Sequence, residues 1–598
     1  MTASLCLILA SYAAGAQDDS VPPKLPPRAK PASPNATVNL VNLLVKQGIL
    51  TEAQAADLIR QAENEAYVAR EASKDAGKKA LEAQKAATEA TTAVSPPGTK
   101  RVTYVPEIVK REMREQIRKE VLDQAKTENW AAPNTFPEWV SRVRFSGDLR
   151  LRFEKQFFPH GNDNVDPSLV NFNAINTGNP FDTNAVIDGS SPPVVPPLRD
   201  VDQNRTRYRL RARLGAEADL GEGFTAGLRT ATGDSSTPVS TNVTLGGGGG
   251  NFSKYPLWLD RGFLRYEAWD VIAAEIGRFD NPFYSPTSLV WYDELGFDGA
   301  ALQSKYEVVP GVVPFFIAGA FPLYNTLLNF PNNGTQGLVG NPLTPAGNLP
   351  SEDKYLFGFQ GGLGWKITDD VALRFGAAYY DFQNVQGRLS GPCNTTFVNS
   401  VCNTDLLRPS FAQYGNTYMA LRNPLPQIGV TPNFQYFGLA SGFRVLDFNG
   451  RVDFAQFNPV HVVVDGAYIK NVAFDRASVA RIAVNNLGPS PDGVTPGPFQ
   501  GGNVGAMGRV TVGYPELKKL WDWNVYGAYK YLQSDATIDA FSDPDFGLGG
   551  TNLRGYIVGA NLGLGQSVWA TIKWMSANAI AGPPFAVDVL QVDINGRF

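Results

Sequence analysis

The chain has 598 residues, which is too many for one ordinary compact core, so more than one module is expected. Charged residues make up 18% of the chain and the formal net charge is −4, which excludes both a basic nucleic-acid-binding surface and a disordered acidic composition. Aromatic residues at 11%, together with 59 glycines, favour an extended β architecture over a helical enzyme.

The N-terminus has the pattern of an export signal. Residues 5–14 are a short apolar run, and Ala14-Gly15-Ala16 supplies the small-residue cleavage pattern. The run is too short to span a bilayer as a helix. No Lys or Arg precedes it, so a start upstream of Met1 and a buried N-terminal helix both stay open as alternatives. We expect residues 1–16 to be a signal peptide.

A linker and several helices are expected between the signal and residue 130. Residues 17–37 are rich in proline and favour an extended linker. Residues 38–94 begin with an apolar cluster and continue as a long solvated helix, started by the capping pair Thr51 and Gln54, that could form a weak coiled coil. Residues 95–130 combine a Pro-Gly break with an amphipathic helix whose apolar residues recur every four positions.

After Trp130 the pattern changes to the two-residue period of β-strands. Residues 142–154 and 207–219 alternate apolar with charged side chains over more than ten positions. Strands of soluble sandwiches usually have about five or six residues, whereas tilted strands that cross a bilayer need about 9–11. The charged side of both runs also suits a water-filled lumen. The pattern therefore predicts an all-β transmembrane barrel over residues 140–598.

Further runs of the same kind bring the expected number to about sixteen antiparallel strands. Their connections alternate between short turns and long loops, which is the pattern of periplasmic turns and external loops in outer-membrane barrels. Both ends of the barrel then face the periplasm, so the number of strands is even. The further candidate strands are 224–232, 258–267, 271–280, 297–306, 313–323, 354–366, 371–382, 443–455, 461–472, 502–514, 522–533, 551–564, 567–577 and 586–598.

The last of these strands carries the most specific signal. Its apolar residues alternate with polar ones and end on Phe598 at the C-terminus. A terminal strand that ends on an aromatic residue resembles the assembly signal read by the outer-membrane insertion machinery. We therefore expect Phe598 to be the recognition residue and an anchor at the membrane interface.

Two of the three cysteines are expected to form a disulfide. Cys6 falls inside the signal, whereas Cys393 and Cys402 lie close together in a stretch rich in Gly, Asn and Thr. In an oxidising exported compartment, a loop disulfide between them is the natural interpretation. A metal pair is disfavoured because no His or further Cys lies near.

Several of these segments resemble the putative-porin family of large outer-membrane β-barrels with a helical N-terminal segment. The resemblance covers about residues 38–598. It implies passive passage of small solutes and no mapped catalytic residues. The segments that carry it are NLLVKQGILTEAQA, YVPEIVKREMREQIRKEVLDQAK, ENWAAP, FSGDLRLRFE, RTRYRLRARLGAEADL, AAEIGRFDNPF and FDGAALQSKYE, of which the two arginine-rich ones are the most specific.

We expect no enzyme activity, cofactor or metal. His160 and His461 are the only histidines, and plain polar roles suit both of them better than catalysis. No serine-hydrolase, zinc-protease or phosphate-binding motif appears. Asp163 and Asp166 could bind Ca²⁺ at a loop tip, but the spacing lacks the glycine and the distal glutamate of a dedicated loop, so ordinary solvated residues are favoured.

The charged faces of the first two strands give the candidate pore lining. If Val143 and Leu210 face lipid, the arginines face the lumen, because a charge on the lipid face costs about 2–4 kcal/mol at the midplane. In many porins the third long loop folds inward, so the resemblance suggests an acidic rim opposite a basic wall. The alternative is that structural ion pairs neutralise these arginines. The expected pore-lining residues are Arg142, Arg144, Arg150, Arg152, Arg205, Arg207, Arg209, Arg211 and Arg213, and the constriction candidates are Asp293, Glu294 and Asp298.

The expected function is passive diffusion of small hydrophilic solutes, ions included, with a preference for anionic or zwitterionic ones. The expected location is the bacterial outer membrane, with the helical segment in the periplasm. Expected partners are outer-membrane lipid, the assembly machinery and copies of the same chain, a trimer first, but no nucleic acid. The competing hypothesis is a tether or adhesin that uses the barrel only as an anchor. A siderophore-type transporter is disfavoured, because such barrels have about 22 strands and a globular plug.

Overall fold

The computed structural model describes Ala56, Lys78 and residues 142–162, 169–185, 196–326, 351–426, 432–492 and 495–598. The chain divides into two compact units, Met1–Pro133 and Asn134–Phe598. All strands of the described residues belong to the second unit. The expected signal peptide, Pro-rich linker, long helix and amphipathic helix lie outside the described residues, apart from Ala56 and Lys78.

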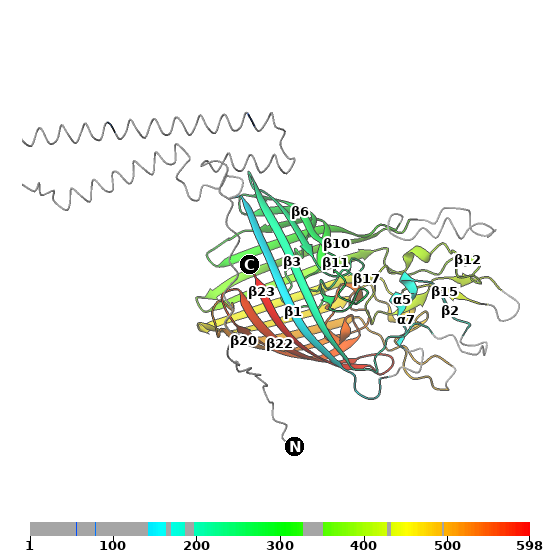
Figure 1. Cartoon of the computed structure of the whole chain (residues 1–598). Coiled ribbons are helices and arrows are strands. Elements are labelled where there is room, and N and C mark those ends of the chain that lie inside the picture. The colour runs from blue at the N-terminus through cyan, green and yellow to red at the C-terminus, as the bar shows by residue number, and fades with distance from the viewer. Residues whose placement is uncertain are drawn as a thin grey trace, which may run out of the picture. The chain divides into compact units, whose positions relative to one another are not determined.

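In the described part of the chain, antiparallel strands close into one barrel. The main sheet has 17 strands, and leaving out the two-residue β5 (Val243–Thr244) gives the sixteen that form the wall, as predicted. The first strand, β1 (Val143–Phe157), pairs with both β3 (Arg205–Gly221) and the last strand, β23 (Ala586–Arg597), so the sheet has no open edge (Figure 1). The other wall strands are β4 (Phe224–Ala231), β6 (Trp258–Ala268), β7 (Ile272–Asp280), β8 (Gly296–Lys305), β9 (Val312–Tyr324), β10 (Lys354–Thr368), β11 (Val371–Gln383), β17 (Phe443–Phe457), β18 (Val460–Asn471), β19 (Val504–Gly513), β20 (Trp523–Leu532), β21 (Leu553–Gly563) and β22 (Val568–Ala579).

The two faces of the wall have opposite polarity, as the alternation in the sequence predicts. Leu151 on β1 is 48% exposed, whereas the next residue, Arg152, is only 4% exposed. The same alternation continues across the seam on β23, where Ile594 is exposed and Asp593 is buried. An apolar outer face around a charged interior is the reverse of a water-soluble protein, and it is the arrangement that a lipid bilayer stabilises.

The two ends of the barrel are built differently. Short turns join the strands at one end, and long loops cluster at the other (Figure 1). Exposed aromatic residues mark the end with the short turns, among them Trp269, Tyr306, Phe457 and Trp521. Aromatic side chains of this kind anchor a barrel at a membrane–water interface.

The long loops carry small secondary structures of their own. The disulfide expected between Cys393 and Cys402 is present in the loop between β11 and β17. No helix in the described ranges is long and apolar enough to cross a membrane. The loop elements are the helices α5 (Phe172–Thr177), α7 (Arg476–Ala480), η2 (Asp405–Leu407), η3 (Asp539–Phe541) and η4 (Phe546–Leu548), and the strand pairs β2 (Phe181–Asp182) with β15 (Phe434–Gln435), β12 (Pro392–Cys393) with β14 (Asn423–Pro424), and β13 (Tyr418–Ala420) with β16 (Phe437–Leu439).

The C-terminal residue completes the seam between the first and last strands. The amide of Gly147 donates to the carbonyl of Phe598 at 2.9 Å, and the amide of Phe598 donates to the carbonyl of Gly147 at 3.0 Å. A Cβ atom on Gly147 would lie 2.4 Å from Cζ of Phe598, so the aromatic ring covers the glycine. The ring is 73% exposed on the same face as Ile594, which is the lipid side of the wall.

Deleting Phe598, or the substitution Phe598→Asp, is expected to reduce insertion into the outer membrane severalfold. The deletion removes two seam hydrogen bonds and the ring over Gly147, and the aspartate places a charge on the lipid face. The measurement is the fraction of heat-modifiable, folded barrel in outer-membrane preparations. Phe252→Asp, in a fully exposed loop, is the matched control and should leave that fraction unchanged. Equal folding of the two variants would contradict the assembly role.

Candidate functional site in the barrel lumen

The arginines of β1 and β3 face one another in register on the inner wall. Arg150 lies directly opposite Arg211, and Arg152 lies directly opposite Arg209. Like charges in such cross-strand pairs repel, so this face requires carboxylates between the guanidinium groups. The structure supplies these carboxylates from the two strands, from β23 and from two loops.

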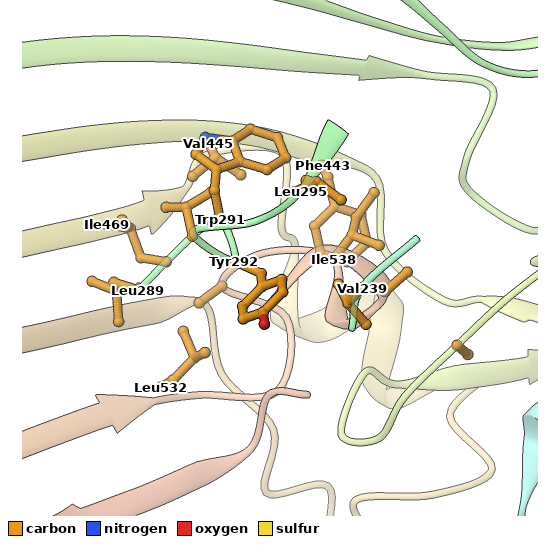
Figure 2. Packing of buried hydrophobic residues seen from close by; sticks show 14 of the residues in the cluster. Val239, Leu289, Trp291, Tyr292, Leu295, Phe443, Val445, Ile469, Leu532 and Ile538 are labelled. Carbon is orange, nitrogen blue, oxygen red and sulfur yellow. The ribbon is translucent and has the colours of Figure 1, made fainter. Parts of the chain in front are cut away.

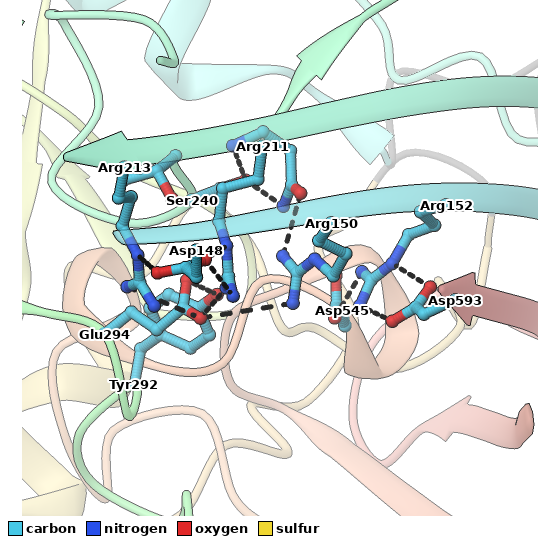
Figure 3. A network of polar contacts seen from close by, with 12 residues as sticks. Asp148, Arg150, Arg152, Arg211, Arg213, Ser240, Tyr292, Glu294, Asp545 and Asp593 are labelled. Carbon is cyan, nitrogen blue, oxygen red and sulfur yellow. Dashed lines mark hydrogen bonds and ion pairs between the residues drawn. The ribbon is translucent and has the colours of Figure 1, made fainter. Parts of the chain in front are cut away.

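The first carboxylates come from β1 itself. Asp148 accepts hydrogen bonds from Nε of Arg211 at 2.9 Å and from Nε of Arg213 at 2.6 Å (Figure 3). Glu154 binds both Arg207 and Arg209, with Oε2 at 3.3 Å from Nη1 of Arg209. Little of either carboxylate is in contact with water. The guanidinium groups therefore stabilise the two negative charges.

The expected pore arginines near the strand ends lie in a different setting. The side chain of Arg144 is 76% exposed and pairs with Glu217 at 3.4 Å. Arg205 is also exposed and pairs with Asp200 at 3.6 Å. Arg142 lies one residue before β1. Most of the expected pore arginines therefore have a carboxylate partner, which is what the alternative of structural pairing describes, and their role in conduction stays a prediction.

The third long loop, residues 281–295, folds into the barrel. Its apolar run includes Leu289 and Trp291, each 1% exposed, and Trp291 packs against Tyr380 with ring centroids 5.1 Å apart. Figure 2 shows these loop residues against Val445 and Ile469, which belong to the inner faces of β17 and β18. Exposure of an apolar run of this length to water is unfavourable, and the hydrophobic effect therefore drives the loop into the barrel. The family resemblance suggested that this loop folds inward, but the burial of its apolar run was not predicted.

Polar contacts hold the same loop to two separate groups of strands. Nη2 of Arg509 on β19 donates to the carbonyl of Pro286 at 2.7 Å, and Nζ of Lys530 on β20 donates to the carbonyl of Ser288 at 3.2 Å. At the far end of the loop, Glu294 reaches the arginines of β1 and β3. The loop therefore crosses the lumen from β19 and β20 to β1 and β3.

Glu294 lies on the basic wall rather than opposite to it. Its carboxylate pairs with Arg211, and Oε1 lies 3.7 Å from Nη1 of Arg213 and 4.0 Å from Nη1 of Arg150 (Figure 3). The hydroxyl of Tyr292 donates to Oε2 at 2.9 Å. Because the opposite charges are in contact, this pair neutralises the wall locally and does not create a field across an open gap.

The other two constriction candidates are placed differently. Asp293 lies beside Glu294 and is exposed to the space inside the barrel. The protein around this space raises the pKa of Asp293 by desolvation, and the nearby charge of Asp543 raises it further. Asp298 departs from the expectation, because it belongs to β8 and pairs with Arg278 of β7 at 2.7 Å. Side chains alternate along a strand, and the buried Phe297 occupies the inner face there, so Asp298 lies on the outer face.

Asp545 is a lumen residue that sequence reasoning missed. It belongs to the loop between β20 and β21, and its carboxylate lies 2.8 Å from Nη1 of Arg152 (Figure 3) and 3.3 Å from Nζ of Lys573. Asp593 of β23 holds the other side of Arg152, with Oδ1 2.8 Å from Nε. No local motif marks an aspartate in an Asp-rich loop as a partner of the first strand.

A second basic row lies halfway round the barrel from β1. Arg374 of β11 is opposite Arg451 of β17, which is opposite Asp465 of β18, which is opposite Arg509 of β19. Asp465 is shared, with 2.6 Å to Nε of Arg451 and 2.7 Å to Nη2 of Arg509. Three arginines and one aspartate make this row positive. Each strand carries only one arginine on its inner face, so only the register between strands reveals the row.

Two cavities lie inside the barrel beside these charges. One, of about 360 Å³, is lined among others by Lys305, Phe315 and Arg374. The other, of about 350 Å³, is lined among others by Glu217 and Arg229. Their lining residues come from β1, β3 and the strands from β4 to β11, so space for small molecules remains beside the inward-folded loops.

Comparisons with known proteins give a family match and several distant structural neighbours. The model of a family described as putative porin matches residues 34–598. No curated protein matches the chain. Among solved structures, OprB of Pseudomonas putida at high pH is 10% identical with a TM-score of 0.37, and the match covers 77% of this chain and 96% of that chain. The outer membrane channel DcaP of Acinetobacter baumannii is 9% identical with a TM-score of 0.33, covering 76% and 97%. OmpF of Salmonella typhi in complex with daunomycin is also 9% identical with a TM-score of 0.33, and the match covers 76% of this chain and 97% of that chain.

Proposed function

This chain belongs to the putative porin family, and from that membership we propose that it is a passive channel for small hydrophilic solutes in the bacterial outer membrane. The observation that carries the proposal is the closed barrel with an apolar outer face and ionised side chains inside. Arg374 is exposed inside the barrel and two cavities lie beside the lumenal charges, so water-filled space remains there, which is what a diffusing solute needs. We place the helical N-terminal segment in the periplasm and expect an assembly of several copies, a trimer first.

We further propose that the channel favours anions over cations. The support is the positive charge of the inner wall. The row of Arg374, Arg451 and Arg509 contains a single acidic residue, Asp465. The wall of β1 and β3 contributes less than the sequence suggests, because its guanidinium groups are paired with carboxylates. A lumen with a small surplus of positive charge favours anions modestly.

The test of both proposals is planar-bilayer conductance of the refolded full chain, with reversal potentials in a salt gradient. In the double variant Arg209→Ala, Arg211→Ala, the anion-to-cation permeability ratio should fall severalfold, because removal of the two guanidinium groups leaves an excess of negative charge on this part of the wall. The carboxylates of Glu154 and Asp148 lose partners in that variant. An unchanged ratio would mean that this wall does not influence selectivity.

The matched control is Arg144→Ala, Arg205→Ala, which removes the same charge from two exposed positions near the ends of the strands. We expect it to change the permeability ratio much less than the lumenal double variant. An equal effect of both double variants would show that the net charge of the protein, and not the inner wall, sets the ratio.

One observation favours the second candidate, an outer-membrane tether or adhesin that is anchored by its barrel. Residues 281–295 and the loop between β20 and β21 meet in a buried apolar cluster inside the barrel, where Trp291 lies beside Phe541 with ring centroids 6.1 Å apart. Such a cluster occupies space that a solute would otherwise use. Absence of conductance from well-folded barrel would contradict the channel and favour the anchor.

A further inference from the structure

Arg374 is held between two aromatic rings on the inner wall of β11. Its Cζ lies 4.1 Å from the ring centroid of Tyr284 and 4.8 Å from that of Phe315. The two rings are themselves perpendicular, at 5.9 Å between centroids and 77° between planes. Stacking on aromatic faces attracts and orients a guanidinium group without neutralising its charge.

Glycines make room for this arrangement. Gly362 of β10 lies directly opposite Gly376 of β11. A Cβ atom on Gly362 would lie 2.2 Å from Cζ of Phe315, and one on Gly376 would lie 3.2 Å from Cδ1 of Tyr284. The paired glycines therefore form the floor on which both rings rest, and a larger residue at Gly362 would displace the ring of Phe315.

The backbone of Tyr284 is fixed by a buried amide. The amide nitrogen of Tyr284 donates to Oε1 of Gln360 at 2.6 Å, and Nε2 of Gln360 donates to the carbonyl of Tyr284 at 2.9 Å. Gln360 is buried on the inner face of β10. The hydroxyl of Tyr284 is also buried and has no hydrogen-bond partner among the described residues. The position of Arg374 is thus set by the fold before any solute arrives.

Arg374 differs from the other arginines of the lumen in its charge environment. Arg451 and Arg509 share Asp465, and the arginines on β1 and β3 that lie deep in the lumen have carboxylate partners. Arg374 is exposed, and no carboxylate of the described residues lies within ion-pair distance of it. Its donor groups and its charge are therefore accessible to an anion in solution.

The cavity of about 360 Å³ beside Arg374 has an apolar side and a basic side. Phe315 and Ile317 of β9 line it, and Lys305 of β8 adds a second exposed cation that has no ion pair among the residues the structure describes. Acidic residues also line the cavity. Glu267 is neutralised by Arg265 at 2.6 Å, which leaves Asp270 as the acidic residue that counts against the cations of the lining. Two cations against one aspartate leave one positive charge in excess, in a volume at the lower end of small-ligand pockets.

We propose that this cavity is a subsite for small organic carboxylates that carry an aromatic or branched apolar group, which pause there while crossing the barrel. The proposal rests on the channel function proposed above and names a solute class for it. The planar guanidinium of Arg374 matches a carboxylate in a two-point contact, and Phe315 and Ile317 take the apolar part of the solute. An inorganic anion would gain the charge contact but not the apolar one.

The experiment uses refolded full-length protein with benzoate, acetate and inorganic phosphate as probes. We would measure the probe concentration that half-reduces the single-channel chloride current, and binding to the folded protein in detergent by its intrinsic fluorescence. Benzoate should act at a concentration at least fivefold lower than acetate or phosphate. Arg374→Gln should weaken benzoate binding about tenfold, because a charge-assisted hydrogen bond is lost. Phe315→Leu should remove most of the advantage of benzoate over acetate.

The matched control is Arg444→Gln on the outer face of β17, which removes one positive charge from an exposed side chain paired with Asp381 at 3.6 Å. It should bind benzoate as the unaltered protein does. Equal action of phosphate and benzoate, or unchanged binding by Arg374→Gln, would overturn the subsite while leaving the channel intact. If the barrel does not conduct, the channel proposal fails, and fluorescence binding still decides whether the subsite exists.

Discussion

Trp291→Ala is expected to release the loop of residues 281–295 from the inner wall and to lower the free energy of unfolding by about 3–5 kcal/mol. The indole is 1% exposed and lies in edge contact with the rings of Tyr380 and Phe297, each at 5.1 Å between centroids. Truncation leaves a large cavity in a cluster that the strands cannot close, because hydrogen bonds to both neighbours hold every strand in the wall in place.

Two measurements check this prediction. The midpoint of urea unfolding should fall with an unchanged slope, and single-channel conductance should rise because the loop no longer occupies the lumen. Phe252→Ala, at a fully exposed loop position, is the control and should change stability by less than about 1 kcal/mol. Unaltered conductance together with lower stability would show that the loop stays in place without its indole.

Arg152→Met is expected to destabilise the folded barrel by about 3–5 kcal/mol, because it leaves two partly desolvated carboxylates without their shared cation. Nε of Arg152 binds Asp593, and Nη1 binds Asp545, both at 2.8 Å. The side chain of Arg152 is almost completely buried, so water cannot replace it. The loop that carries Asp545 should also become accessible to protease.

A neutral network provides the decisive comparison. The double variant Arg152→Met, Asp593→Asn removes the stranded charge of Asp593 and leaves Asp545 paired with Lys573, so it should recover most of the stability, as measured by urea unfolding in lipid vesicles. Arg144→Ala breaks an exposed ion pair and should cost no more than about 1 kcal/mol. Failure of this double variant to recover stability would show that Arg152 acts through its packing and not through its charge.

The wall of the barrel was predictable because each strand carries its own signal. Alternation over ten or more residues identifies a strand without reference to any other, and the strand expected at 224–232 is found at Phe224–Ala231. Strand ends were less accurate. β1 continues to Phe157 and β17 to Phe457, since hydrogen bonding to neighbouring strands extends a strand beyond its own pattern.

The lumen was less predictable, because its contacts join residues that are far apart in the chain. Arg152 and its partner Asp545 are 393 residues apart, and nothing in either local sequence indicates the other. Arg374 and Arg451 become neighbours only through the register of β11 with β17. The face of Asp298 depends on where β8 begins, and an error of one residue reverses the side on which a side chain lies.

The seam at Phe598 has a consequence for how the protein is made. The strands that close the barrel are the first and the last wall strands along the chain, and Arg152 and Asp593 meet although they are 441 positions apart. A ribosome that stops early, or a protease that trims the C-terminus, produces a sheet with two unpaired edges. Such edges bind other strands indiscriminately, so incomplete chains are aggregation-prone, and only a chain that includes both β1 and β23 can bury both edges at once. A topology whose closing contacts are this distant in sequence therefore folds slowly and stays exposed to aggregation until the barrel closes.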